Sequence, residues 1–201
     1  MAHIQTQSGI RIDFIEPEIG DIKLEDITHA LSMKCRFNGH TSHFYSVARH
    51  SLLVADITRH VLKKSDVPKD DHADIYFKAL IHDFSEAYIS DIHSPLKAML
   101  PAYKHIELML TNKIDSYFRV RYTPDTDWVV HTADRIALII ENNLLLPRPL
   151  DESIIDSVPD KYFSLTHKQS FDDYVIKATM ENYDREDTMI ELEKKVRSLY
   201  G

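Results

Sequence analysis

Residues 82–97 read HDFSEAYISDIHSPLK, and this stretch decides what kind of protein the sequence encodes. It opens with His82 and Asp83, two metal-ligand types side by side, directly after the apolar run Ala79–Ile81. The predicted helix is therefore becoming buried where ionisable groups appear. Such groups are costly in a core unless something satisfies them, and a metal ion is one way to do so. The stretch predicts a divalent metal site built for hydrolysis.

Glu86 extends this polar cluster. It lies four residues after His82 and three after Asp83, so on a continuous helix all three side chains face one pocket. The alternative is a polar patch on the helix surface, which is the better interpretation for an isolated His-Asp pair. The apolar residues before this pair favour the buried site.

A lone histidine upstream falls on the interior side of another predicted helix. Residues 44–64 carry one apolar stripe at spacings of three and four, formed by Val47, Val54, Ile57 and Val61. His50 lies on the same stripe. Taken alone, such a residue is more often a hydrogen-bonded core histidine than a ligand. Its interior position nevertheless makes His50 a candidate partner for the His-Asp pair.

Asp134 is a stronger outlier, because its helix face is otherwise apolar. The surrounding residues of that face are Val130, Ala133, Ala137 and Leu138. An unpaired carboxylate there would shift its pKa or destabilise the fold, so it needs a cation. A salt bridge to Arg135 is a poor alternative, since adjacent residues point away from each other on a helix.

Two imidazoles and two carboxylates would bind one divalent ion and leave room for water. Such a mixed nitrogen and oxygen set suits Mn, Fe, Co, Ni or Zn, and the ligand types alone do not choose among them. An ion with open positions lowers the pKa of bound water and neutralises charge on a phosphoryl oxygen.

Composition limits the other possibilities. The chain has 201 residues, enough for one domain with a real core. A net charge of -8 without a long basic run argues against a nucleic-acid partner, but a metal could still attract a small phosphorylated substrate. Cys35 is the only cysteine, which favours a reducing compartment. No apolar run approaches the ~20 residues of a membrane span, so we expect no membrane partner and a cytoplasmic location, or the host cytoplasm if a phage encodes the chain.

The periodicity predicts an all-α domain with a small N-terminal β hairpin. Alternating apolar residues around Ser8-Gly9 indicate the hairpin, with strands over 3–7 and 10–15. Helical patterns follow over residues 24–34, 44–64, 70–88, 101–120, 123–146 and 170–199, with a further helix whose first turn holds Pro95. We expect a single domain over 1–201, with 1–20 as a hairpin extension and 150–201 as a C-terminal helical part that follows a polar loop at 150–168.

The ordered set His50, His82-Asp83 and Asp134 resembles that of the HD-domain metal-dependent phosphohydrolases, which implies an HD-type helical bundle. The segment 82–97 is similar to the HD-x-SE-x(4)-D-x(3)-P-x-K segment of small bacterial 5′-deoxynucleotidases. It looks equally like the small phage dATP triphosphohydrolases, in which blocks similar to RFNGHT, at 36–41, and FYSVARHS, at 44–51, also occur. The resemblance covers about residues 24–140.

The resemblance implies a role for each matching residue. The metal would be held by four side chains, those of His50, His82, Asp83 and Asp134. Glu86 would act as general acid/base or support a second ion, which would be Mg or Co. Asp91 would orient the attacking water or coordinate that second ion. Arg36 and Lys97 would bind phosphate. Phe37 would pack on the sugar and disfavour a ribose 2′-hydroxyl, although the deoxynucleotidases often carry tryptophan there.

These roles lead to one main function and several alternatives. The leading hypothesis is a dNTP triphosphohydrolase, acting on dATP or a similar purine nucleotide and releasing triphosphate by attack of a metal-activated water. The alternatives are a 5′-deoxynucleotidase acting on deoxynucleoside monophosphates and a non-catalytic nucleotide-sensing HD protein. A hydrolase of cyclic nucleotides or alarmones is a further option. We expect a homo-oligomer, because relatives of this size assemble in that way.

A few other residues are weaker candidates. His40, His43 and His93 lie in loops near the predicted site and are at least as consistent with solvent exposure. Tyr88 and Trp128 could stack on a base, but a structural role is the better interpretation for both. The C-terminal stripe is expected to be core or oligomer interface, and it consists of Met180, Met189, Leu192 and Val196.

Overall fold

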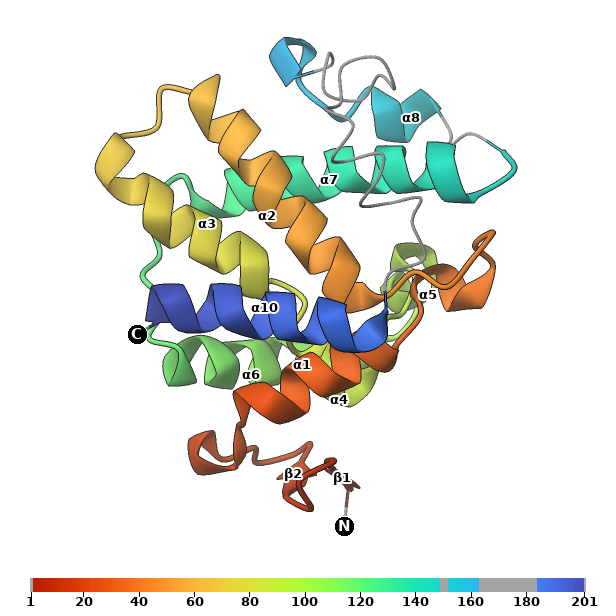
Figure 1. The fold of residues 1–201 in the computed structure, drawn as a ribbon, viewed down its shortest axis with the longest axis vertical. Coiled ribbons are helices and arrows are strands. Elements are labelled where there is room, and N and C mark those ends of the chain that lie inside the picture. Colours follow the sequence, from red (N-terminus) through yellow and green to blue (C-terminus); the bar gives the residue numbers. More distant parts are fainter. Residues whose placement is uncertain (1, 149–151, 163–183, 201) are drawn as a thin grey trace.

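The computed structural model describes residues 2–148, 152–162 and 184–200 (Figure 1). An antiparallel hairpin of β1 (His3–Gln5) and β2 (Arg11–Asp13) precedes a set of packed helices. These helices are α1 (Leu24–Met33), α2 (Val47–Lys63), α3 (His72–Ile81), α4 (Glu86–Ile89), α5 (Ser94–Ala98), α6 (Pro101–Tyr117), α7 (Thr126–Leu145), α8 (Glu152–Ile155) and α10 (Arg185–Tyr200). Short 3-10 turns are η1 (Ile19–Asp21), η2 (Arg36–Gly39) and η3 (Lys69–Asp71). The all-α prediction with a small hairpin is confirmed.

The hairpin turns where the sequence predicts it. Ile4 pairs with Ile12, and Gly9 takes the left-handed φ of 87° that a tight turn requires. Asp26 of α1 stabilises this turn, because its carboxylate accepts hydrogen bonds from the Ser8 amide at 2.8 Å and the Ser8 hydroxyl at 2.6 Å. The observed strands are shorter than the predicted ones.

Helix α2 is the centre of the domain. It packs against both α3 and α7, as Figure 1 shows. The predicted stripe of this helix is fully buried, with Val47, His50, Val54 and Val61 each 0% exposed. Ser46 caps the start of α2 by accepting a hydrogen bond from the Arg49 amide at 3.1 Å. His50 therefore sits on a rigid helix inside the protein.

The core has two parts that meet along α2. One part joins α1, α3, α4, α6 and α10, and the other joins α2, α3 and α7. Leu192 and Val196 of α10 are fully buried in the first part, so the prediction that this stripe belongs to the core is confirmed for them. Met189 is partly buried, whereas Met180 lies outside the described residues.

The helix predicted over residues 70–88 is interrupted, which corrects the sequence interpretation. Helix α3 ends at Ile81, and α4 starts only at Glu86. Between them the backbone forms i to i+3 hydrogen bonds, from the Phe84 amide to the Ile81 carbonyl and from the Glu86 amide to the Asp83 carbonyl. This tighter winding redirects the chain at the His-Asp pair. The side chains of His82, Asp83 and Glu86 still line one region, but through a turn.

Other boundaries differ from the predictions by a few residues. Helix α6 ends at Tyr117, and α7 runs from Thr126 to Leu145. Helix α8 falls within the predicted loop 150–168, and the part of the predicted C-terminal helix over 170–183 lies outside the described residues. Within the described part of the chain, no helix combines the length and the apolar composition that crossing a membrane requires.

Candidate metal and phosphate site

The predicted ligand residues come together where α2, α7 and the turn after α3 meet. One ligand atom each from His50, His82 and Asp134 lies within 4.8 Å of the others. Asp83 Oδ2 lies 3.4 Å from His50 Nε2 and 3.1 Å from His82 Nε2. Asp134 Oδ1 lies 3.2 Å from His50 Nε2. Residues that are up to 84 positions apart in the sequence thus direct nitrogen and oxygen atoms at one point.

The protonation pattern of the two imidazoles fits a metal ion. The Nδ1 atom of His82 lies 2.8 Å from the Ala79 carbonyl, which can only accept, so this nitrogen carries the hydrogen. The Nδ1 atom of His50 lies 2.6 Å from a carboxylate oxygen of Glu141. Both Nε2 atoms are buried and have no hydrogen-bond partner within the described part of the chain. Their lone pairs are therefore oriented for a cation, as in metal sites whose ligand histidines are held by an outer partner.

The carboxylates of the cluster favour the charged form. Burial alone would raise the pKa of Asp83, but the neighbouring imidazoles of His82 and His50 outweigh it and hold that pKa well below its usual range. The pKa of Asp134 is also lowered, since the His50 imidazole, 3.2 Å away, outweighs the partial desolvation of this carboxyl group. Ionised carboxylates next to unpartnered imidazole nitrogens form a donor set that fits a divalent ion of the transition series.

Glu141 is a central residue that the sequence analysis missed. It is 0% exposed and accepts three hydrogen bonds, from His50 Nδ1 at 2.6 Å, Arg36 Nε at 3.1 Å and the Tyr45 hydroxyl at 3.1 Å. It lies seven residues after Asp134, on the same face of α7. A glutamate within the apolar run ALIIE was the available signal. This carboxylate links the metal cluster to the arginine.

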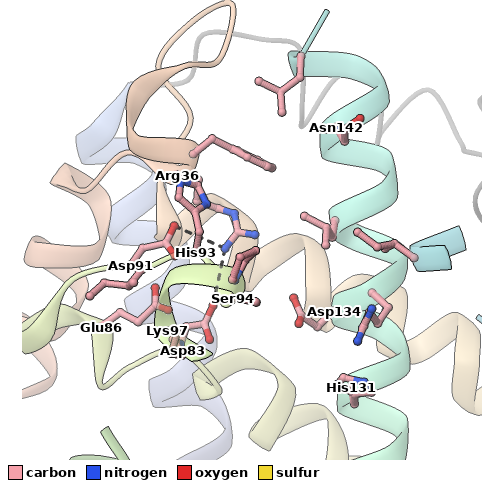
Figure 2. A pocket seen from close by; sticks show the side chains of 17 residues that line it. Arg36, Asp83, Glu86, Asp91, His93, Ser94, Lys97, His131, Asp134 and Asn142 are labelled. Carbon is pink, nitrogen blue, oxygen red and sulfur yellow. Dashed lines mark ion pairs between the residues drawn. The ribbon is translucent and has the colours of Figure 1, made fainter. Parts of the chain in front are cut away.

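Arg36 enters the site from the unusual turn η2. The residues after it, Phe37 and Asn38, have positive φ values of 53° and 50°, and Gly39 has 77°. A positive φ is uncommon for a bulky residue such as phenylalanine and is found where the surroundings enforce it. Arg36 Nη1 lies 3.9 Å from Asp83 Oδ2 and 4.0 Å from Asp91 Oδ2 (Figure 2). The guanidinium is thus held next to the cluster.

The cluster opens into a cavity of about 560 Å³. Figure 2 shows Asp83, Glu86, Asp91 and Asp134 at one end, together with the cations Arg36 and Lys97. Acidic groups that could hold a metal ion and basic groups that could bind an anion therefore face the same space. This combination is suited to a phosphorylated small molecule.

Glu86 and Asp91 both line the cavity. Glu86 is 4% exposed, and no described residue is a hydrogen-bond partner of its Oε2 atom. Burial, and then the charges of Asp83 and Asp91, raise the pKa of Glu86 to about 10. A carboxylic acid that keeps its proton beside a cavity is able to donate it. Asp91 lines the same cavity and faces Arg36.

Two lysines support this end of the cavity. Lys97 lines it from α5, and its Nζ atom donates to Glu107 Oε1 at 2.6 Å. Lys34, which the sequence analysis did not identify, donates to the backbone carbonyls of Glu86 and Ala87 at 2.5 and 2.7 Å. Burial lowers the pKa of Lys34 to about 8. Lys34 therefore holds the short helix α4 that carries Glu86.

The weaker candidates separate into two groups. His93 lines the cavity, and so does His131 of α7, which the sequence analysis did not select. His40, His43, Tyr88 and Trp128 are not among the cavity residues. Tyr88 belongs to the core, and the Trp128 indole donates to Asp125 Oδ1 at 2.6 Å, so the structural interpretation holds for both.

Comparison with known proteins places the site in a family. The family described as 5′-deoxynucleotidase YfbR-like matches residues 29–142, a range that contains every residue of the metal cluster. The uncharacterized protein YfdR of Escherichia coli is 40% identical over 143 residues, which cover 70% of this chain and 71% of the relative. An uncharacterized protein of Rhodobacter capsulatus is 33% identical over 114 residues, and the match spans about half of each chain, 55% in both cases.

Proposed function

The chain belongs to the YfbR-like family of HD-domain metal-dependent phosphohydrolases, and on this premise we propose that it is a 5′-deoxynucleotidase, which hydrolyses the phosphate ester of deoxynucleoside 5′-monophosphates. The family match favours this alternative over the triphosphohydrolase that the sequence analysis ranked first. The observation that carries the proposal is the donor set of His50, His82, Asp83 and Asp134, which opens into a cavity that also presents Arg36 and Lys97.

The four donor residues would hold one divalent ion. When bound, such an ion supplies a Lewis acid, which activates water and neutralises charge on a phosphoryl oxygen. The unpartnered Nε2 atoms of His50 and His82 and the ionised carboxylates support this assignment. The donor types fit Mn, Fe, Co, Ni or Zn. Only if the protein acted instead as a triphosphohydrolase would Glu86 and Asp91 serve as ligands of further Mg or Co ions.

Arg36 and Lys97 would bind the phosphate. A guanidinium presents a planar set of donors that matches phosphate oxygens, and Arg36 is fixed by its hydrogen bond to Glu141. Lys97 reaches the same space while pairing with Glu107, so phosphate binding would draw its ammonium group away from that carboxylate. Both residues would stabilise the negative charge of the transferred group.

Glu86 would be the general acid. Its raised pKa keeps the proton on the carboxyl at neutral pH, and the proton would pass to the 5′-oxygen as the bond from phosphorus to that oxygen breaks. Asp91 would accept a hydrogen bond from the attacking water and orient it for in-line attack. Phe37, held at a positive φ beside Arg36, would pack on the deoxyribose and disfavour a 2′-hydroxyl.

A dNTP triphosphohydrolase is the second candidate. The specific observation in its favour is that Arg135, His131 and His93 line the same cavity in addition to Arg36 and Lys97. This basic set could contact a longer phosphate chain. The similarity of the RFNGHT and FYSVARHS blocks to phage enzymes supports it as well.

A substrate and product screen tests the proposal. The chelator-treated protein is reloaded with Mn²⁺, Co²⁺, Zn²⁺ or Mg²⁺ and offered each dNMP, NMP and dNTP, with products resolved by chromatography. Nucleoside and orthophosphate from dNMPs, with little turnover of NMPs and none by the metal-free protein, is the expected result. Release of intact triphosphate from dNTPs would establish the second candidate. Failure to hydrolyse any of these compounds would leave a nucleotide-sensing protein, and the Asp134→Ala variant controls for contaminating phosphatase.

A further inference from the structure

The connection between α4 and α5 begins with a strained residue. Ser90, which directly follows α4, has a φ of 72° and a ψ of 157°. This combination is essentially restricted to glycine. Phe37 and Asn38 of η2 also have positive φ, but their ψ values of 31° and 28° keep them in the left-handed helical region that other residues sometimes adopt. Ser90 therefore keeps its conformation only because contacts from the rest of the fold enforce it.

The strained residue directly precedes Asp91, which has the task of orienting the attacking water in the proposed function. Asp91 lines the cavity and lies 4.0 Å from the Arg36 guanidinium. Figure 2 shows it on the same side of the cavity as Glu86, opposite Asp134 of α7. Because φ and ψ are the soft torsions of the backbone, the ψ of Ser90 sets the direction in which the Asp91 side chain leaves the chain. An ordinary conformation at Ser90 would turn this carboxylate away.

Ser90 is held through both of its backbone polar groups. Its amide donates to the Glu86 carbonyl of α4 at 3.0 Å, and its carbonyl accepts a hydrogen bond from the Tyr103 hydroxyl at 2.7 Å. The amide contact leaves the ψ of Ser90 free. The carbonyl, however, belongs to the peptide group that leads to Asp91, and its orientation is set by that ψ. The hydroxyl of Tyr103, which comes from α6, therefore holds the peptide group that aims Asp91.

The same face of α6 also contacts the phosphate-binding lysine. Glu107 lies one turn after Tyr103 and accepts a hydrogen bond from Lys97 Nζ at 2.6 Å. This Nζ atom lies 5.6 Å from the centre of the Tyr103 ring. The two parts of Tyr103 thus act on different residues of the site, since its hydroxyl holds the Asp91 segment and its ring lies beside Lys97. Removal of the hydroxyl alone separates the two contacts.

We propose that Tyr103 is a positioning residue, whose hydroxyl holds the Ser90 carbonyl and thereby keeps the Asp91 carboxylate directed at the attacking water. The proposal rests on the proposed function, which gives Asp91 that task. Without the hydroxyl, Ser90 is released towards torsions that serine prefers, and Asp91 spends part of its time turned out of the cavity. Binding of the substrate phosphate depends on Arg36 and Lys97, which keep their contacts. The effect should therefore fall on kcat and not on KM.

The test uses Tyr103→Phe, which keeps the ring and removes the hydroxyl. kcat, KM and inhibition by phosphate are measured with the metal-loaded enzyme and the nucleotide that the wild type hydrolyses best. kcat should fall by roughly 3- to 10-fold, the effect of one lost neutral hydrogen bond, while KM and inhibition stay unchanged. Tyr200→Phe is the matched control, because its hydroxyl also donates to a backbone carbonyl, that of Tyr117 at 2.9 Å, at the other end of α6. Its kcat should not change.

A second substitution tests why kcat falls. Ser90→Gly introduces the residue that adopts these torsions without strain. In this background Tyr103→Phe should lower kcat by less than about twofold, since glycine does not need the hydroxyl to keep the turn. A role of Tyr103 in stability alone would give the same loss of kcat in both backgrounds, and this result would overturn the proposal.

Amide hydrogen exchange of the metal-free protein is a readout independent of activity. The amides of Ser90 and Asp91 should exchange roughly 3- to 10-fold faster in Tyr103→Phe and at the wild-type rate in Tyr200→Phe. An unchanged kcat, a KM that rises as kcat falls, or unchanged exchange would each contradict the proposal. If the wild type hydrolyses no nucleotide, or if Asp91→Asn keeps full kcat, the proposed function or its mechanism fails. The exchange rates then still decide whether Tyr103 holds the Asp91 segment.

Discussion

Replacement of Glu141 by glutamine should weaken the contact that orients His50, a ligand of the metal cluster. The substitution keeps the size and shape of the side chain and removes its charge. Glu141 is fully buried and holds His50, Arg36 and Tyr45 through three hydrogen bonds. A glutamine oxygen can still accept from one or two of these partners. Its NH₂ group, however, would face one of the three donor groups and could not accept a hydrogen bond from it.

The expected magnitude follows from these contacts. Without Glu141, the ion-pair partners left to the buried Arg36 guanidinium among the described residues are Asp83 at 3.9 Å and Asp91 at 4.0 Å. Breaking one partner of a buried ion pair typically costs about 3–5 kcal/mol, and the retained amide hydrogen bond places this case near the lower end. Loss of a partner that orients a ligand histidine lowers metal affinity or activity by about 10- to 100-fold.

Two measurements check these values. Urea unfolding of the metal-free protein gives the change in the free energy of unfolding, and competition with a chromophoric chelator gives the metal affinity. Glu18→Gln is the matched control, because Glu18 is exposed and distant from the cluster in the fold. If Glu141→Gln bound metal with wild-type affinity and retained full kcat, Glu141 would have no part in orienting His50, and the explanation of its burial would be wrong.

Three further substitutions test other parts of the site. Glu86→Gln removes the acidic proton but not the donor set, so kcat should fall by about 10²- to 10⁴-fold while metal stoichiometry stays the same; an unchanged kcat would exclude Glu86 as general acid. Arg36→Lys keeps the charge but loses the planar fork, so phosphate should inhibit less strongly and KM should rise about tenfold, measured by steady-state kinetics; equal inhibition by phosphate would contradict its role. Because burial lowers the pKa of Lys34 to about 8 from an ordinary 10.5, the folded protein binds fewer protons there than the unfolded chain between these values. The free energy of unfolding of the wild type relative to Lys34→Met should therefore rise from pH 8 to pH 10 in urea titrations, and a flat or falling difference would count against the burial of a charged Lys34.

Local patterns predict much of this fold. Ser8-Gly9 marks the hairpin turn, Pro95 and Pro101 mark helix starts, and apolar spacing identifies α2 and α7. These features depend on the conformational preferences of a few consecutive residues, so a single sequence contains them. The residue types of the metal cluster are recognisable for a related reason. Ionisable groups on apolar helix faces need a partner. Four such residues in one chain can meet this need together by binding the same metal ion.

The missed side-chain contacts of Glu141 and Lys34 involve partners distant in sequence. Glu141 is 91 positions from His50, and Lys34 is 52 positions from the Glu86 carbonyl that it contacts. Nothing in the periodicity of either segment specifies its partner, because many buried polar residues would fit the same pattern. The turn at residues 82–85 escaped prediction because its sequence is compatible with a helix. Only packing of the chain selects the tighter winding that separates α3 from α4.

Metal ligands of the site lie on rigid helices, whereas Arg36 lies at a strained turn. α2 and α7 are packed along their length in the core, so His50, Asp134 and Glu141 have little freedom to move. Ligand geometry needs this rigidity, since small displacements weaken metal binding. Arg36 instead depends on the left-handed turn of η2, whose cost of about 1–3 kcal/mol per strained residue must be offset by contacts such as that with Glu141. Glu141 therefore stabilises the metal end and the phosphate end together, which explains why a charged residue is present at a fully buried position of the site.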